Sequence, residues 1–524
     1  MAPQERIQTI DILRGIALLG ILIINFTVDD WDAGLYKGFS GVIDQLFYWP
    51  IKLLMDDRFM ATYCFLFGLG FAIQMQRAAR RGKPFVFAFL RRMIALYLIG
   101  TIANIVFKGS VLESYAVTGL LLLLFWKLPT RLLPIVALVC FLTPTTIAII
   151  NSIHEQTQNA VVANHPLAID KKTLDRYVGV YENQEHKVTV VYRDNTILYG
   201  QGVHNKIRLY PISQNEFKLE NRNLIQVFVT NAQGRVVKFE ARNAAHEVLQ
   251  TWNRTDMPVA AGLKLQDQQR KGVGINKPSY WQFVKNNATE FRQVFPRMFL
   301  HWDMMLGTIL VLFVLGMYAG KKRIFYDVNG NTPLLKRVFK WGLICGGPAV
   351  LMEGGFQAYD FWNNIQIGSY SSFIQTVRDS IWNAGIIPLT LAYIAGITLL
   401  LNKEKFRKKL AFLARVGRLG LTNYLLHLAA AMLLFNNVNF PWDLSGNIGC
   451  FYRVMVAIPV YCVIYLFSRW WLMHFSIGPV EWLWRSATYL TWQPLRLPKA
   501  AAEDSISKKG IRTKRLRTGK VSAD

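Results

Sequence analysis

An apolar segment near the start of the chain reads Arg6-Ile-Gln-Thr-Ile-Asp-Ile-Leu-Arg-Gly-Ile-Ala-Leu-Leu-Gly-Ile-Leu-Ile-Ile-Asn25. A helix that crosses the hydrocarbon core of a bilayer needs about 20 predominantly apolar residues, and this segment has that length. It carries Asp11 and Arg14 and lacks a small-residue cleavage site. The segment therefore predicts a retained first transmembrane helix rather than a cleaved signal peptide.

Apolar runs of this kind recur along the 524 residues, and the hydrophobic content of 52% is too high for one water-soluble domain of this length. We predict an α-helical polytopic membrane protein with about ten transmembrane helices and an inserted antiparallel β domain. The predicted helices are Thr9–Val28, Arg58–Met75, Phe85–Phe107, Glu113–Trp126, Leu132–Asn151, Trp302–Gly320, Val338–Met352, Trp382–Leu401, Gly417–Phe435 and Cys450–Met473.

The distribution of basic residues predicts the orientation. The formal net charge is +27, and Lys and Arg cluster in every second connector, for example in residues 77–92, 321–337 and 403–415. Basic connectors face the cytoplasm, so both termini are expected there, and the basic tail from Lys508 to Lys520 is expected to touch anionic lipid. Nothing in the chain resembles a groove-reading or base-stacking module, so nucleic acid is not an expected partner.

Between the two apolar halves the hydrophobic period changes from helical to two. Short strands separated by turn residues predict an antiparallel meander or small barrel, outside the cytoplasm because it follows the fifth helix. The predicted domains are 1–151 with helices one to five, 152–292 as the β-rich insert, 293–497 with helices six to ten and an interfacial helix, and 498–524 as a disordered tail. The predicted strands are residues 186–192, 196–199, 206–210, 216–219, 224–229 and 235–239.

The five cysteines lie within or at the ends of apolar runs and form no CxxC pair. Neither a disulfide framework nor a thiolate metal site is expected, and no motif predicts a tightly bound cofactor.

The first helix carries the sharpest polar pattern. Arg14 and Asn25 are eleven residues apart, so they share one stripe, and Asp11 lies one turn from Arg14. Gly15 and Gly20 would let another helix approach closely. An intramembrane Arg is a functional hypothesis by default. The alternative is an Arg14 that snorkels to the cytoplasmic interface with Asp11 as its partner.

The ninth helix supplies a candidate for proton transfer. Gly420, Asn423 and His427 follow 3, 4 spacing on one face, and imidazole titrates near neutral pH. The alternative is an interhelical hydrogen bond that only joins helices.

Two further groups lie near helix ends. His301 and Asp303 flank Trp302 at the predicted outer end of the sixth helix and could act on an acceptor hydroxyl. Side chains two residues apart on a helix do not face each other, so the alternative that these residues only anchor the helix end is favoured. Glu481 and Arg485 form an i, i+4 pair that is typical of an interfacial helix. Alternatively Arg485, Arg418 and Arg14 converge on an anionic donor such as the phosphates of CoA, which would make them, with Glu481, donor-binding residues.

Five motifs in order resemble the YeiB-like membrane protein family, also called domain of unknown function 418, which is related to the transmembrane acyltransferases. They are Arg6–Asn25, Arg58–Phe71, Ser110–Gly119, Gly417–His427 and Gly478–Arg485.

The resemblance implies a multi-pass protein of the bacterial plasma (inner) membrane that moves an acyl group from a cytoplasmic donor, with acyl-CoA as a possible co-substrate, to an envelope acceptor. The insert resembles domain of unknown function 3471 through Leu174–Glu182 and Leu209–Ser213, which implies a binding or lid role.

Two positions depart from the related patterns. Many membrane O-acyltransferases have His where Asn25 stands, and the YeiB-like pattern usually has Asp where Ser110 stands. A neutral amide is no general base near pH 7, so Asn25 would at most orient a substrate. The catalytic candidates are His427, Asn423, Asn25 and Asp11.

The leading hypothesis is an acyltransferase that acts on a cell-envelope glycan, lipid or metabolite, within a membrane whose lipids are also partners. A transporter of a small amphiphile is one alternative, for which Gly346-Gly-Pro348 is the only obvious helix interruption. A non-catalytic envelope scaffold is the other. The sequence leaves the oligomeric state open.

Overall fold

The structure is a computed structural model. It describes residues 7–27, 41–82, 84–164, 167, 169–183, 188–194, 197–200, 207–219, 224–243, 246–270, 279–300, 304–363, 370–435, 438, 442, 444 and 448–496.

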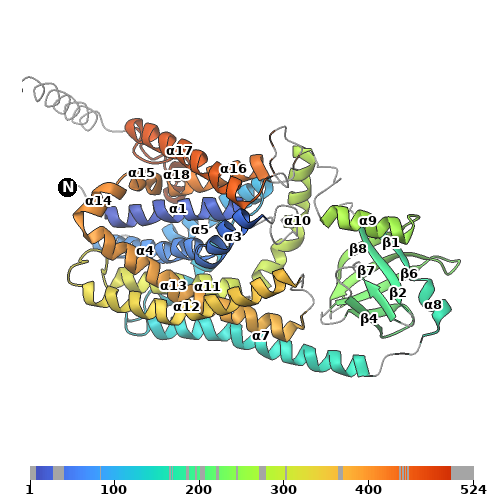
Figure 1. Ribbon diagram of the computed structural model, residues 1–524. Helices are drawn as coiled ribbons and strands as arrows, with labels where there is room; N and C mark the ends of the chain where they lie inside the picture. Colours follow the sequence, from blue (N-terminus) through green and yellow to red (C-terminus); the bar gives the residue numbers. More distant parts are fainter. Residues whose placement is uncertain are drawn as a thin grey trace, which may run out of the picture.

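Most of the described chain is helical, and the long helices pack side by side in one bundle (Figure 1). Each of the ten predicted apolar segments coincides with a helix, because a run of about 20 apolar residues is the strongest local signal in the sequence. These helices are α1 (Gln8–Thr27), α4 (Arg58–Arg80), α5 (Val86–Phe107), α6 (Leu112–Phe125), α7 (Leu133–Asn164), α11 (Met304–Lys321), α12 (Thr332–Trp362), α13 (Ser372–Asn402), α16 (Gly420–Phe435) and α17 (Cys450–His474).

Six helical segments of the described chain are long and apolar enough to cross a membrane. Three shorter apolar helices, Leu112–Phe125, Gly307–Lys321 and Gly420–Phe435, accompany them. The chain therefore has the helices of a membrane protein. The six segments are Gln8–Thr27, Val42–Arg80, Val86–Phe107, Leu133–His154, Phe373–Asn402 and Cys450–His474.

Several helix bounds differ from the prediction. The proposed interruption at Gly346-Gly-Pro348 is wrong, because α12 is continuous from Thr332 to Trp362 with Pro348 inside it. A proline removes one backbone hydrogen bond, which a long helix packed against neighbours tolerates. The ninth predicted helix is divided, because α15 ends at Arg418 and α16 begins at Gly420.

Further helices connect or cover the apolar ones. Hydropathy alone misses them because they mix apolar and charged residues, as α3 does with Asp44 and Lys52. Among them only the helix near the C-terminus was predicted, and its place at the membrane interface stays a prediction. The set comprises α3 (Val42–Leu54), α8 (Lys171–Asp175), α9 (Val259–Arg270), α10 (Tyr280–Leu300), α14 (Glu404–Leu410), α15 (Leu413–Arg418) and α18 (Pro479–Tyr489).

The insert is a closed barrel of eight antiparallel strands in sequence order, which agrees with the predicted antiparallel domain. Its interior is filled by aromatic side chains, including Tyr181, Phe217, Phe228 and Phe239. Six strands lie at predicted positions, whereas β1 and β8, which pair to close the barrel, were not predicted. The strands are β1 (Gly179–Glu182), β2 (Val188–Asp194), β3 (Ile197–Gly200), β4 (Ile207–Pro211), β5 (Glu216–Leu219), β6 (Leu224–Thr230), β7 (Val236–Asn243) and β8 (Val248–Thr255).

Glycines set how closely the helices approach. A Cβ atom on Gly68 of α4 would lie 1.9 Å from the carbonyl oxygen of Phe313 in α11, and one on Gly316 would lie 2.0 Å from that of Phe65. Only glycine allows this backbone contact, which is common between membrane helices. The barrel lies beyond one end of the bundle, near α9 and α10, whereas α14 and the start of α1 lie at the other end (Figure 1).

Candidate functional site

Arg14 lies on α1 and faces α4. Its Nη1 is 3.6 Å from Oδ1 of Asp11, one turn earlier, and its side chain is 33% exposed against 6% for Asp11. A Cβ atom on Gly70 of α4 would lie 3.9 Å from Nη2 of Arg14. Both sequence-based interpretations of Arg14 included the contact with Asp11, and the structure adds that the guanidinium lies against a glycine of a second helix.

Two further arginines lie in the same region. The Arg92 guanidinium of α5 stacks on the indole of Trp484, with Cζ 3.7 Å from the ring centroid, and Trp484 Nε1 donates to the Arg92 carbonyl oxygen at 2.8 Å. The charges of both Arg485 and Arg14 act on Arg92. Three arginines from α1, α5 and α18 thus form one cationic cluster, which we call the arginine cluster. Like charges repel one another, and an anionic ligand would offset that repulsion.

Arg418 is brought to the same end of α1 by close packing. A Cβ atom on Gly417 would lie 1.9 Å from the carbonyl oxygen of Asp11, and one on Gly15 would lie 2.2 Å from that of Leu413. Helices α1 and α15 therefore meet backbone to backbone, as the glycines of α1 predicted. Arg418 is half-buried directly after this contact.

Glu481 connects α18 to the start of α16. Its Oε1 accepts hydrogen bonds from the backbone N–H groups of Leu421 at 2.7 Å and Thr422 at 3.2 Å, and its Oε2 accepts one from the Thr422 hydroxyl at 2.5 Å. A carboxylate at a helix N-terminus satisfies otherwise unpaired donors and complements the helix dipole. Glu481 therefore fixes the position of α18, and with it Arg485.

Tyr63 on α4 lies between the arginine cluster and α16. The charges of Arg14, Glu481 and Asp11 all act on its hydroxyl group, which a Cβ atom on Gly420 would approach to 2.6 Å. Within the described residues this hydroxyl oxygen is buried without a hydrogen-bond partner. Tyr63 was not among the predicted site residues, although it lies inside the motif Arg58–Phe71.

The two predicted polar residues of α16 behave differently. Asn423 Nδ2 donates to the Val416 carbonyl oxygen and to Ser468 Oγ, both at 2.9 Å, so it joins α16 to α15 and α17. His427 is fully buried, and neither ring nitrogen has a hydrogen-bond partner in the described part of the chain. The interhelical hydrogen bond that was the alternative for His427 is absent from these residues, whereas Asn423 makes one. A buried imidazole without partners is costly.

A buried carboxyl group lies near the start of α6. Asn104 donates to Glu113 Oε2 at 2.6 Å and accepts from the backbone N–H of Ser110 at 2.9 Å. The backbone N–H of Val111 donates to the Tyr424 hydroxyl at 3.2 Å, three residues before His427. Glu113 therefore places a carboxyl group close to Ser110, the position at which the YeiB-like pattern usually has Asp. Glu113 was not among the predicted site residues.

The remaining predicted residues are less informative. Asn25 is half-buried near the C-terminal end of α1. His301 and Asp303 lie outside the described residues. Within those residues no group of three or more His, Cys, Asp or Glu side chains could hold a metal ion.

Comparisons with known proteins match two families. Residues 6–177 match a family described as "Heparan-alpha-glucosaminide N-acetyltransferase, catalytic", and residues 319–491 match "Protein of unknown function (DUF418)". The chain is 24% identical over 506 residues to "Uncharacterized protein YxaH" of Bacillus subtilis (strain 168), covering 94% of this chain and 96% of that protein. It is 40% identical over 85 residues to "Uncharacterized protein YeiB" of Escherichia coli (strain K12), covering 16% and 21%. No solved structure matches the chain.

Proposed function

Because this chain belongs to the YeiB-like membrane proteins with a DUF418 domain, we propose that it is a transmembrane acyltransferase. It moves an acyl group from a cytoplasmic acyl-CoA-like donor to a cell-envelope glycan, lipid or metabolite. The observation that carries the proposal is the arginine cluster, which lies in a chain whose residues 6–177 match an acetyltransferase model.

The proposed topology has ten spanning helices in the bacterial plasma membrane, with both termini in the cytoplasm. The start of α1 and the basic helix α14 lie at one end of the bundle and the barrel at the other, which supports a barrel outside the cytoplasm (Figure 1). In this arrangement Arg14 lies in the inner half of the membrane. The two helical halves, 1–151 and 293–497, form the catalytic part, and the insert 152–292 presents the acceptor.

Arg14, Arg92 and Arg485 bind the phosphate groups of the donor. Arginine donates two parallel N–H groups to a phosphate, and three guanidinium groups in one place match a polyanion better than a single charge does. Arg418 is the fourth candidate because the contact between α1 and α15 holds it at the same end. Glu481 acts as a positioning residue through its contacts with α16.

The transfer step needs a base for the acceptor. The acceptor hydroxyl or amine attacks the thioester carbonyl carbon, the carbon–sulfur bond breaks, and the acceptor proton passes through the base to the leaving thiolate. His427 is the leading candidate for this base because both ring nitrogens are buried without partners in the described residues. Glu113 is the second candidate, and Asn25 would orient the substrate.

Donor binding tests the proposal directly. Purified full-length protein is incubated with radiolabelled acetyl-CoA and longer acyl-CoAs, and both binding and donor hydrolysis are measured. We expect Arg14→Ala and Arg92→Ala to weaken donor binding at least about tenfold, since each removes a charge-assisted hydrogen bond. Arg407→Ala, in the exposed part of α14, is the matched control that should leave binding unchanged. Neither binding nor hydrolysis in the wild type would refute the proposal.

The transporter and scaffold alternatives are separable by experiment. The continuous helix α12 removes the only interruption that the sequence offered in favour of transport. Uptake of a labelled amphiphile into proteoliposomes would favour transport, and full donor turnover without the insert would show that the barrel is dispensable for chemistry.

A further inference from the structure

Arg58 is a buried charge that the proposed donor site does not use. It is the first residue of α4 and has no exposed surface. Burying a guanidinium group inside a membrane-spanning segment is costly, so an arginine there usually marks a pair or a functional site.

The surroundings of Arg58 hold it in one orientation. Its Cζ lies 4.1 Å from the ring centroid of Trp382 on α13, and its Nη1 donates to the main-chain oxygen of Asp56. The neighbouring carboxylates have other partners: Asp57 Oδ2 accepts from Trp382 Nε1 at 2.8 Å, and Asp56 Oδ2 lies 2.8 Å from Lys52 Nζ. Within the described residues Arg58 forms no ion pair.

Nε and Nη2 of Arg58 are buried and have no hydrogen-bond partner in the described chain. These two atoms form one edge of the guanidinium plane, and their N–H bonds point in parallel. That edge matches the two oxygens of a carboxylate or phosphate group. We call it the Arg58 edge.

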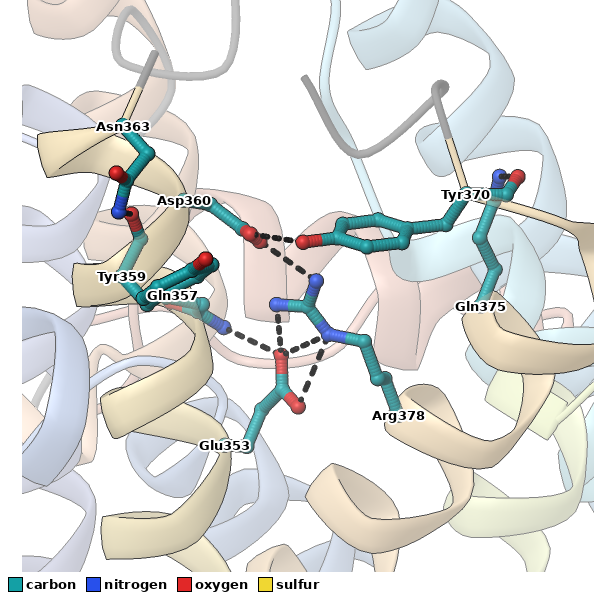
Figure 2. A network of polar contacts seen from close by, with 8 residues as sticks. All are labelled: Glu353, Gln357, Tyr359, Asp360, Asn363, Tyr370, Gln375 and Arg378. Atoms are coloured by element: carbon teal, nitrogen blue, oxygen red, sulfur yellow. Dashed lines mark hydrogen bonds and ion pairs between the residues drawn. The ribbon is translucent and has the colours of Figure 1, made fainter. Parts of the chain in front are cut away.

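A second buried arginine, Arg378, has a carboxylate bound at the same edge of its guanidinium group. Figure 2 shows Arg378 of α13 facing Glu353 of α12, with its Nε at 3.1 Å and its Nη2 at 2.9 Å from Glu353 Oε1. Its Nη1 donates to Asp360 Oδ2 at 2.6 Å. Every donor nitrogen of Arg378 thus has a carboxylate, whereas no described carboxylate binds the corresponding edge of Arg58.

We propose that the Arg58 edge binds the carboxylate or phosphate group of a ligand. Arg58 begins α4, whereas Arg77 and Arg80 lie at the other end of this helix, where the cytoplasm is proposed. The ligand therefore approaches from the acceptor side, and identifying it as the acyl acceptor rests on the proposed function. The binding of the anion itself does not.

Thermal unfolding of full-length protein in detergent tests the proposal. The probes are acetate and inorganic phosphate, each compared with chloride at equal ionic strength, and the readout is the midpoint Tm. We expect acetate or phosphate to raise Tm saturably in the wild type. Arg58→Lys keeps the charge but cannot donate two parallel hydrogen bonds. In this variant the rise in Tm should therefore be lost or need at least about tenfold more anion. Arg58→Met serves as a second variant if the lysine protein does not fold.

Controls separate this site from the donor site and from general salt effects. Arg378→Lys and the exposed Arg407→Lys should keep the rise. The arginine cluster is itself proposed to bind phosphate, so Arg14→Ala should keep the acetate-dependent rise, and acetate is the probe that separates the two sites. The same measurement in micelles that contain phosphatidylglycerol shows the source of the anion. If Tm rises with this lipid but not with free acetate or phosphate, the ligand of the Arg58 edge is a lipid headgroup. An equal rise in the wild type and both Arg58 variants, or no rise with any probe, would overturn the proposal.

Discussion

The network of Arg378, Glu353 and Asp360 predicts a strong and asymmetric effect of substitution. Arg378 makes ion pairs of 2.9 Å to Glu353 and 2.6 Å to Asp360, and both carboxylates are almost fully buried, at 4% and 5% exposure. Replacing Arg378 by Met leaves two buried negative charges without their cation. Tyr370 still donates to Asp360 at 2.5 Å, which cannot replace a charge.

The magnitude follows from the burial. Breaking a buried ion pair by removing one partner costs about 3–5 kcal/mol of unfolding free energy. At about 2 °C per kcal/mol for a folding unit of a few hundred residues, Tm should fall by about 6–10 °C. Replacing all three groups with neutral residues in the variant R378M/E353Q/D360N should recover most of this loss, because no uncompensated charge remains.

The assay is thermal unfolding of detergent-purified protein followed by tryptophan fluorescence. Lys336→Met, an exposed substitution on α12, is the matched control and should change stability by no more than about 0.5 kcal/mol. The reasoning is refuted if Arg378→Met shifts Tm by less than about 2 °C, which is well below the estimate above. It is also refuted if the triple variant is as unstable as the single one.

Three further predictions use the same protein. Glu481→Ala should lower the free energy of unfolding by about 1–3 kcal/mol because it leaves the first N–H groups of α16 unpaired. Glu404→Ala on α14 is the control and should change it very little. Equal losses in the two variants would contradict the role of Glu481 at the start of α16. His427→Asn should lower acyl transfer by about 10²–10⁴-fold while leaving donor binding unchanged, and full turnover would remove His427 from the chemistry. Hydrogen bonds from Lys238 and Arg242 lower the pKa of Glu240 in the barrel. The stabilisation that the ionised Glu240 gives the folded protein is therefore fully present above pH 4.5, the ordinary pKa of Glu, and is lost as pH falls through the lowered pKa. The Tm difference between wild type and Glu240→Gln should therefore shrink on acidification, and a constant difference would contradict this assignment.

The helices were predictable from the sequence because each is a local property. A long apolar run has few alternatives to a buried or membrane-spanning helix, and the ten predicted apolar segments all coincide with helices in the described residues. The barrel was predictable only in part. Six strands were predicted from a period of two in the sequence, but β1 buries three consecutive residues and no residue of β8 is fully buried, so neither strand gives that pattern. Their pairing with each other closes the barrel, and no short window along the chain contains both strands.

The site was predictable only where one charge interrupted an apolar run. Arg14 stood out for this reason, and Arg485 through its spacing from Glu481. Arg92 did not, because in the sequence it looks like one more basic residue of a connector that is predicted to be cytoplasmic. Its place in the cluster follows from α5 packing against α18, which joins residues almost 400 positions apart. Such a contact leaves no local pattern.

Arg58 shows the same limit more sharply. An arginine at the first residue of an apolar helix looks the same in sequence whether it extends to the interface or is buried. Here the preceding Asp57 has a left-handed backbone with φ of 61°, and Trp382 from α13 covers the guanidinium plane. The turn and the indole together decide that Arg58 is buried while Arg14 stays 33% exposed. If this is correct, Trp382→Leu should release Arg58 toward solvent and abolish the anion-dependent rise in Tm as fully as Arg58→Lys does.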